Sequence, residues 1–318
     1  MFQRILIPLD GSPLAESVLP HAVAMAQAAG GEIFLLRVLD VIGAVTRPRS
    51  VDPFDWQIRK TEVEMYIKEV AQRLEEQGVT VHHSLVEGKA AEQIIEFAHQ
   101  NEMDLIVLSS HGQSGVSGWN VSSVVQKVIL RAQTSILLIR AYAAGSTPLG
   151  EKTYRRIMLP LDGSQRSECV LPLAEMLART YDAELLFVHV VEKPEIPRRT
   201  PPTQEDLDLV ERITERNRIE AEKYFNDLRS RVDAQMQVRI LVNENAASVL
   251  HTMVEQNQVD LVVLSAHGYS GETRWPYGSI VIGFIAYGSS PLLVFQDLAA
   301  NQIQPSPAER AAQEHGGR

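Results

Sequence analysis

The chain repeats itself, and this repeat sets the strongest limit on its fold. RILIPLDGS at Arg4–Ser12 returns as RIMLPLDGS at Arg156–Ser164. Further on, DLIVLSSHGQSG from Asp104 returns as DLVVLSAHGYSG from Asp260, with nine of twelve residues identical and a separation of 260 − 104 = 156 residues. In a chain of 318 residues, this doubling predicts two similar domains rather than one large domain.

We place the first domain at residues 1–141 and the second at residues 154–297. Residues 142–153 between them are mostly small or polar and contain Pro and Gly, which is typical of a linker. Residues 298–318 have no apolar face to bury, so we expect them to form a disordered tail.

Within each domain, short apolar runs alternate with segments of helical pattern and end on a fifth strand. This order predicts an α/β fold: two tandem doubly wound domains, each a five-stranded parallel sheet flanked by helices, Rossmann-like. We expect the first helix to run from Pro13 to Gly30, with Ser12 as its N-cap. Ligands of such sheets bind beyond the carboxyl ends of the strands, where the strand order reverses. Asp10 and Asp162 end the first strands, so they should meet the loops after the fourth strands if those strands are neighbours.

Composition narrows the classes of function. The 30 Lys and Arg residues against 40 Asp and Glu give a net charge of −10, which is unsuited to a general nucleic-acid binder. Cys169 is the only cysteine, so an intrachain disulfide is excluded, and we interpret it as a small core residue. No apolar run approaches the ~20 residues that span a bilayer, and the opening MFQRILIPLD lacks the core of a secretory signal. We therefore expect a cytoplasmic protein without a membrane or nucleic-acid partner.

The loop after the fourth strand is the strongest candidate for a binding site. It reads S-x-H-G, nine residues and G-S in the second domain, and a helix follows. No Lys follows its glycines, so it is not a Walker A motif, and neither domain contains G-x-G-x-x-G. Glycine lets a phosphate approach the backbone, and a helix N-terminus offers N–H groups to an anion. An ordinary strand-to-helix connection without a ligand is the alternative.

The doubled pattern resembles the universal stress protein family in its tandem two-domain form. Nucleotide-binding members of that family carry G-x-x-G, nine residues, and then G-S or G-T. The second domain matches at Gly268 and Gly278, with Ser265 in place of the first glycine. The first domain departs at two of the three glycines, where it has Ser109 and Ser122. The resemblance covers both repeats, and the family also contains members that do not bind ATP.

The resemblance implies that the aspartate after the first strand, a valine late in the second strand, and the loop residues bind ATP, with Mg²⁺ as its companion ion. In the second domain these positions are Asp162, Val190, Ser265, Gly268, Gly278, Ser279 and Ile280, to which we add Arg274 because its charge could offset phosphates. In the first domain they are Asp10, Val38, Ser109, Gly112, Ser122 and Ser123. We expect the second domain to be the better site, because Ser122 places a Cβ where a phosphate would approach.

Several of these residues also have a purely structural interpretation. Asp162 could act only in an Asp-Gly-Ser turn. His111 and His267 are expected to be loop residues bonded to the backbone, because no nucleophile and acid accompany them in the sequence. Trp119 and Trp275 are expected to pack the loops against the body, with stacking on adenine as the alternative.

Three functions remain open. The first is an ATP-binding stress-response regulator or tolerance factor. The second is a protein-interaction module that binds no nucleotide, and the third is an ATP hydrolase. We expect no catalytic residues and no metal cluster of the protein's own, so any hydrolysis should be slow.

The last strands of the two domains, Ile136–Ile139 and Leu292–Phe295, are strongly apolar. Left open, each would form an exposed sheet edge. We expect these strands to pair with each other within one chain. Whether two chains then form a homodimer stays open, and the protein partners are not identified by the sequence.

Overall fold

A computed structural model of the chain describes residues 1–39, 53–112, 121–141, 148–194, 201–269 and 277–298. Arg274, Trp119 and Trp275, together with the tail from residue 299 onward, lie outside these residues. Among the residues that are described, no helix is both long and apolar enough to cross a bilayer.

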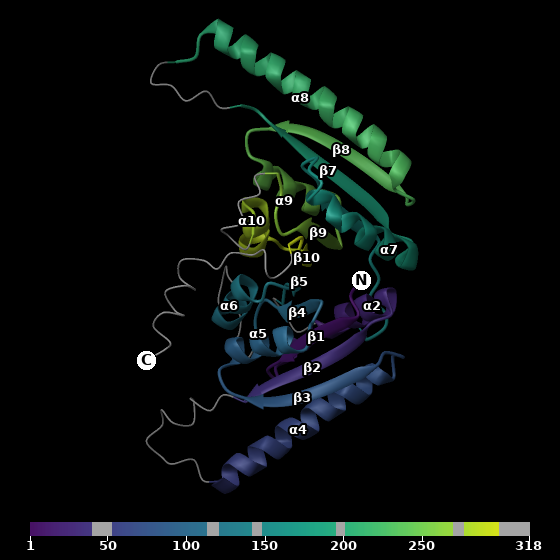
Figure 1. Cartoon of the computed structure of the whole chain (residues 1–318), viewed down its shortest axis with the longest axis vertical. Helices are drawn as coiled ribbons and strands as arrows, with labels where there is room; N and C mark the ends of the chain where they lie inside the picture. Colours follow the sequence, from purple (N-terminus) through teal and green to yellow (C-terminus); the bar gives the residue numbers. More distant parts are fainter. Residues whose placement is uncertain (40–52, 113–120, 142–147, 195–200, 270–276, 299–318) are drawn as a thin grey trace.

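The strands join into one ten-stranded sheet (Figure 1). Their bounds are β1 Arg4–Leu9, β2 Glu32–Leu39, β3 Val81–Glu87, β4 Leu105–Ser109, β5 Ser135–Ile139, β6 Arg156–Pro160, β7 Glu184–Glu192, β8 Met236–Asn243, β9 Leu261–Ser265 and β10 Leu292–Phe295. The order across the sheet is β3-β2-β1-β4-β5-β10-β9-β6-β7-β8. Each half is therefore the parallel doubly wound sheet that the alternating pattern predicted.

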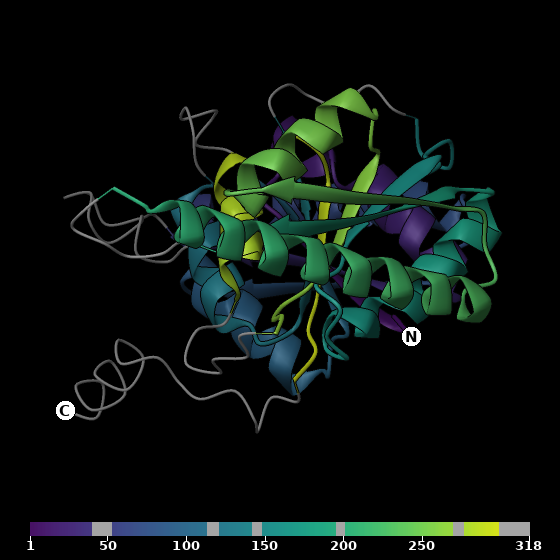
Figure 2. The same ribbon diagram turned by 90° about the horizontal axis from the view of Figure 1, so that it is seen from above.

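The helices cover both faces of this sheet. Their bounds are α1 Pro13–Glu16, α2 Leu19–Ala29, α4 Pro53–Glu75, α5 Ala90–Gln100, α6 Ser123–Arg131, α7 Leu171–Tyr181, α8 Gln204–Arg231, α9 Ala246–Gln256 and α10 Ser279–Tyr287, and a 3₁₀ turn, η1 Ser167–Val170, precedes α7. One buried cluster packs α2, α4, α7 and α8 on one face, and a second packs α5, α6, α9 and α10 on the other. Figure 2, seen from above, shows α8 running along β7 and β8.

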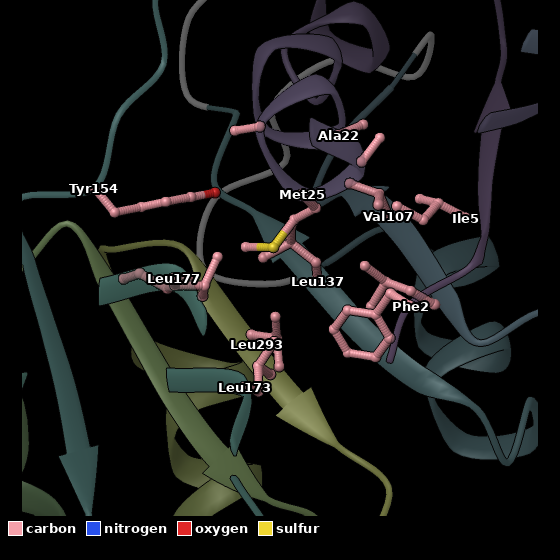
Figure 3. Close-up of a cluster of buried hydrophobic side chains, with 14 of the residues drawn as sticks. Phe2, Ile5, Ala22, Met25, Val107, Leu137, Tyr154, Leu173, Leu177 and Leu293 are labelled. Atoms are coloured by element: carbon pink, nitrogen blue, oxygen red, sulfur yellow. The ribbon is translucent and has the colours of Figure 1, made fainter. Parts of the chain in front are cut away.

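The two halves meet where β5 pairs antiparallel with β10. Leu138, Leu137 and Ile136 lie opposite Leu292, Leu293 and Val294. This is the pairing expected from the two apolar last strands, and it leaves neither edge open. Figure 3 shows Leu137 of the first half beside Leu293 of the second, in a cluster to which both halves contribute.

The first helix differs from the expectation, because it is divided into α1 and α2. Ser12 caps α1 as expected, accepting a hydrogen bond from the Ala15 N–H at 3.1 Å, and Gly30 ends α2 with φ 63°. The break falls after Glu16. Pro20 has no N–H to donate to the Glu16 carbonyl four residues earlier, so an uninterrupted helix would lack this hydrogen bond.

Candidate functional site

The first and fourth strands of each half are neighbours, so the aspartates and the S-x-H-G loops meet as expected. β1 pairs with β4, and β6 pairs with β9. In the second domain a cavity of about 740 Å³ opens at this edge of the sheet, a size within the range of small-molecule sites. Seven of the eight residues expected to bind nucleotide line it: Asp162, Val190, Ser265, Gly268, Gly278, Ser279 and Ile280. The eighth, Arg274, lies outside the described residues.

Asp162 forms hydrogen bonds with both loops of this site, the loop after β6 and the loop after β9. One carboxylate oxygen, Oδ1, accepts hydrogen bonds from the Ser164 N–H at 2.9 Å and the Ser164 hydroxyl at 2.6 Å. The other, Oδ2, accepts the Tyr269 N–H at 2.5 Å. Burial raises the pKa of the Asp162 carboxyl, but these hydrogen bonds outweigh burial and hold the pKa below its ordinary value. Asp162 therefore acts in the Asp-Gly-Ser turn and also lines the cavity.

Gly268 is required by the close approach of Asp162. A Cβ at residue 268 would lie 2.4 Å from Oδ2 of Asp162, and a Cβ at Gly112 would lie 2.1 Å from Oδ2 of Asp10. Both distances are far inside van der Waals contact, so an alanine would separate the carboxylate from the loop and disturb the hydrogen bonds of the aspartate. The glycine of S-x-H-G thus serves the loop-to-aspartate contact in both domains.

We expect Gly268→Ala and Gly112→Ala each to lower the free energy of unfolding by about 1–3 kcal/mol, the usual cost of overpacking. Gly283→Ala is the matched control, because its Cβ would have its nearest contact at 3.9 Å, inside the helix α10. That alanine should raise the free energy of unfolding by about 0.5–1 kcal/mol. Urea denaturation of the three variants measures all of these changes. Equal stability of Gly268→Ala and the unmodified protein would contradict the assigned contact.

Ser265 lines the cavity, but its hydroxyl already has a partner. It donates to the His267 carbonyl at 2.6 Å, and Ser109 donates in the same way to the His111 carbonyl at 2.6 Å. At the position where the family pattern has its first glycine, this chain therefore uses serine to fasten the turn of the loop.

The helix α10 begins at the cavity without a side-chain cap. Its N-cap residue is Gly278, which has no side chain to accept a hydrogen bond. The Gly278 N–H donates to the Ala266 carbonyl at 2.8 Å and so anchors the loop to the end of β9. Ser279, Ile280 and Val281 form the first turn of α10 and line the cavity. Their N–H groups have no acceptor within the helix, so this end of α10 is suited to bind an anion.

The corresponding helix of the first domain is capped by its own side chain. Ser122 is the N-cap of α6, and its hydroxyl accepts the Val125 N–H at 3.3 Å. The Ser122 N–H donates to the Ser110 carbonyl at 2.9 Å, just as Gly278 donates to Ala266. The two loops are thus anchored alike, and Ser123 follows the cap as the first residue of α6. They differ at the helix N-terminus, where the Ser122 hydroxyl accepts a backbone N–H of α6 and Gly278 has no side chain to do so for α10.

A second difference lies at the end of the second strand, where Arg37 precedes Val38 and His189 precedes Val190. His189 Nδ1 lies 2.8 Å from the Leu161 carbonyl, and Arg37 Nη1 donates to the Leu9 carbonyl at 3.2 Å. Burial lowers the pKa of Arg37, while the nearby Asp10 acts in the opposite direction. The first-domain site thus holds an arginine beside Asp10, where the second domain has a histidine.

Both loop histidines contact a neighbouring side chain. His267 Nδ1 lies 2.8 Å from Oδ1 of Asp297, and His111 Nδ1 lies 3.0 Å from the Ser110 hydroxyl. Both rings are buried, and each contacts a side chain, a kind of partner that the sequence had not indicated. Cys169 packs against the buried core, and burial raises the pKa of its thiol to about 12, in line with a core residue rather than a nucleophile.

Several lining residues were not found from the sequence. Tyr269 is 85% exposed and follows Gly268 directly, so the loop motif could have pointed to it. Asn217, Glu220 and Tyr224 reach the cavity from α8, which carries no motif. The described lining residues include three carboxylates, Asp162, Glu192 and Glu220, and no Lys or Arg. A strongly negative ligand would therefore need a counter-ion, or a cation from outside the described residues.

The sequence and the fold are similar to known proteins over almost the whole chain. The sequence profile described as "Universal stress protein family" matches residues 1–140 and again residues 153–296. Universal stress protein MJ0531 of Methanocaldococcus jannaschii is 31% identical over 144 residues, which are 44% of this chain and 83% of that protein. Universal stress protein Mb2028c of Mycobacterium bovis is 24% identical over 274 residues, 81% of this chain and 86% of that protein.

A solved structure shares the arrangement of both halves. The crystal structure of a universal stress protein from Archaeoglobus fulgidus has a TM-score of 0.63 and 18% sequence identity, and the match covers 94% of this chain and 100% of that chain. At this identity the likeness concerns the fold alone.

Proposed function

The chain belongs to the universal stress protein family, and on that premise we propose that its second domain binds an adenine nucleotide, ATP with Mg²⁺, in the cavity beside Asp162 and Gly278. The observation that carries the proposal is the N-terminus of α10, which opens on this cavity with no side-chain cap. The same end of α6 is capped by Ser122, so the first domain is the weaker site.

In this arrangement the backbone of Val190 and the apolar side chains beside it, such as Leu250, would hold the base. Asp162 would lie beside the nucleoside, and the first turn of α10 would hold the phosphates. Because the described lining has three carboxylates and no Lys or Arg, Mg²⁺ would offset the charge of the triphosphate.

The role that fits such a site is that of a cytoplasmic stress-response regulator or tolerance factor that senses or stores a nucleotide. In the described lining, the Ser265 hydroxyl donates to the His267 carbonyl and His189 Nδ1 lies against the Leu161 carbonyl, so these two are not paired as a nucleophile and its base. We therefore expect ATP turnover slower than about 1 per second, the low end of ordinary enzymes.

The experiment has two parts. The protein is purified without added nucleotide and denatured, and the small molecules released are identified. The nucleotide-free protein is then titrated calorimetrically with ATP and with adenosine, each with Mg²⁺ or with EDTA. We expect one ATP site per chain, weakened about tenfold or more by EDTA, while the affinity for adenosine stays the same.

A second candidate function has one observation in its favour. The carboxylates in the described lining disfavour a polyanion, as would suit an interaction module that binds no nucleotide. No released nucleotide, together with no heat of binding for ATP or adenosine, would support that candidate and reject the proposal.

A further inference from the structure

The helix α10 of the second domain is held at its N-terminal end by the first domain. Tyr277 immediately precedes Gly278, and its side chain is 4% exposed. Its hydroxyl donates to the Ile129 carbonyl of α6 at 2.9 Å. The residue beside the proposed phosphate site is thus fastened to the other half of the molecule.

The C-terminal end of α10 is held by the same neighbour. Arg140, which follows β5, donates from Nη2 to the Phe284 carbonyl at 2.6 Å and to the Ile285 carbonyl at 2.7 Å. A cation at this end also complements the negative end of the helix dipole. Both ends of α10 are therefore hydrogen-bonded to the first domain. The pairing of β5 with β10 fixes the position of α10 relative to these partners.

Among the described residues, the two positions that correspond to Tyr277 and Arg140 do not give α6 the same support. At the repeat spacing of 156 residues, Val121 corresponds to Tyr277, and Gln296 corresponds to Arg140. Valine has no hydroxyl to donate, and glutamine has no charge. The Gln296 N–H instead donates to the Ser135 hydroxyl at 3.1 Å. The two halves thus have similar folds but unequal roles at their junction.

We propose that Tyr277 and Arg140 are positioning residues through which the first domain holds the phosphate-binding end of α10 in place. The proposal rests on the proposed function of the second domain, and it gives the first domain a role that needs no ligand of its own. A helix end that is already held in place loses less conformational entropy when a phosphate binds. Tyr277 should affect the binding of the phosphates and not of the base, because the proposed base site beside Val190 is away from the start of α10.

The test compares two cross-domain tyrosines. Tyr277→Phe removes the hydroxyl and keeps the ring. Tyr181→Phe is the matched control, because the Tyr181 hydroxyl also donates across the halves, to the Ala24 carbonyl at 2.6 Å, and does not line the cavity. We expect Tyr277→Phe to weaken ATP binding by about three- to tenfold with adenosine binding unchanged, and Tyr181→Phe to change neither. An unchanged ATP affinity in Tyr277→Phe, or an equal loss for ATP and adenosine, would overturn the proposal.

A second measurement needs no ligand and separates this proposal from the proposed function. Hydrogen exchange of the ligand-free protein should be faster across 278–287 in Tyr277→Phe and in Arg140→Gln than in the unmodified protein, and unchanged there in Tyr181→Phe. If the unmodified protein binds no ATP, the proposed function fails and the exchange rates still decide whether α10 is held from the first domain. Unchanged exchange in both variants would reject that support.

Discussion

A protein carrying Gly278→Ser should fold normally and lose at least about tenfold in ATP affinity. The serine would convert the N-terminus of α10 into the form seen at Ser122, where the hydroxyl accepts a backbone N–H of the first turn. The new Cβ has room, because its nearest neighbour would be the Ala266 carbonyl at 3.7 Å. Serine is also a good N-cap, so the free energy of unfolding should stay the same or rise by a few tenths of a kcal/mol.

The loss of affinity has two causes. The hydroxyl would compete with the phosphate for the N–H groups of Ser279 to Val281, and the Cβ would stand between the phosphate and the backbone. Together these are expected to cost at least about 1.4 kcal/mol, which corresponds to tenfold in the dissociation constant. Calorimetric titration with ATP and Mg²⁺ measures the affinity, and urea denaturation measures the stability.

Ser122→Gly is the reciprocal control. It should lower stability slightly by removing the cap from α6, and leave ATP affinity at the second domain unchanged. If Gly278→Ser bound ATP as tightly as the unmodified protein, the N-terminus of α10 would not be the phosphate site.

The repeat, the alternating pattern and the apolar last strands predicted the parallel doubly wound arrangement of each half and the pairing of β5 with β10, whereas the adjacency of the first and fourth strands was a condition that the structure supplied. The sheet arrangement follows from burial, because a strand such as Leu261–Ser265 is buried along its whole length and must be covered on both faces. The break after Glu16 was missed because Pro20 was not weighed against the carbonyl four residues before it.

The site was predictable where its residues lie in or next to the loop motif or, like Val190, at a position that the family resemblance marks. The S-x-H-G loop follows β9, and Asp162 follows β6. Parallel strands bring their carboxyl ends to one edge of the sheet, so the two were expected to lie close together. The lining residues of α8, such as Asn217 and Tyr224, depend on how a long helix packs across the sheet. No local sequence motif indicates this packing. The cross-domain bonds of Tyr277 and Arg140 were missed for the same reason, because they join residues more than 140 positions apart.

Mild acid should destabilise the junction between the halves through His21. This side chain in α2 has Nδ1 2.9 Å from the hydroxyl of Tyr154, which is fully buried at the start of the second domain; Figure 3 shows the ring of Tyr154 directed toward the helix that carries Ala22 and Met25. Burial, reinforced by the charge of Lys152, lowers the pKa of His21 from 6.5 to about 3.

The direction of the effect follows from this depressed pKa. The unfolded chain binds a proton as the pH falls below 6.5, whereas the folded protein does not until about pH 3. The contribution of His21 to the free energy of unfolding is therefore fully present above about pH 6.5, and it is lost as the pH falls between these two values. At pH 5 the loss from this one histidine should be about 2 kcal/mol, since each pKa unit corresponds to about 1.4 kcal/mol.

Urea denaturation at pH 7 and pH 5 measures this loss, and His21→Gln should remove it because glutamine is neutral throughout. His83→Gln is the control, at an exposed position of β3, and should retain the full loss. A loss of the same size in His21→Gln would show that acid acts elsewhere. The helices α2 and α7 also meet at this junction, where the Tyr181 hydroxyl donates to the Ala24 carbonyl. Charging His21 should therefore weaken the contact between the two halves rather than the interior of either half.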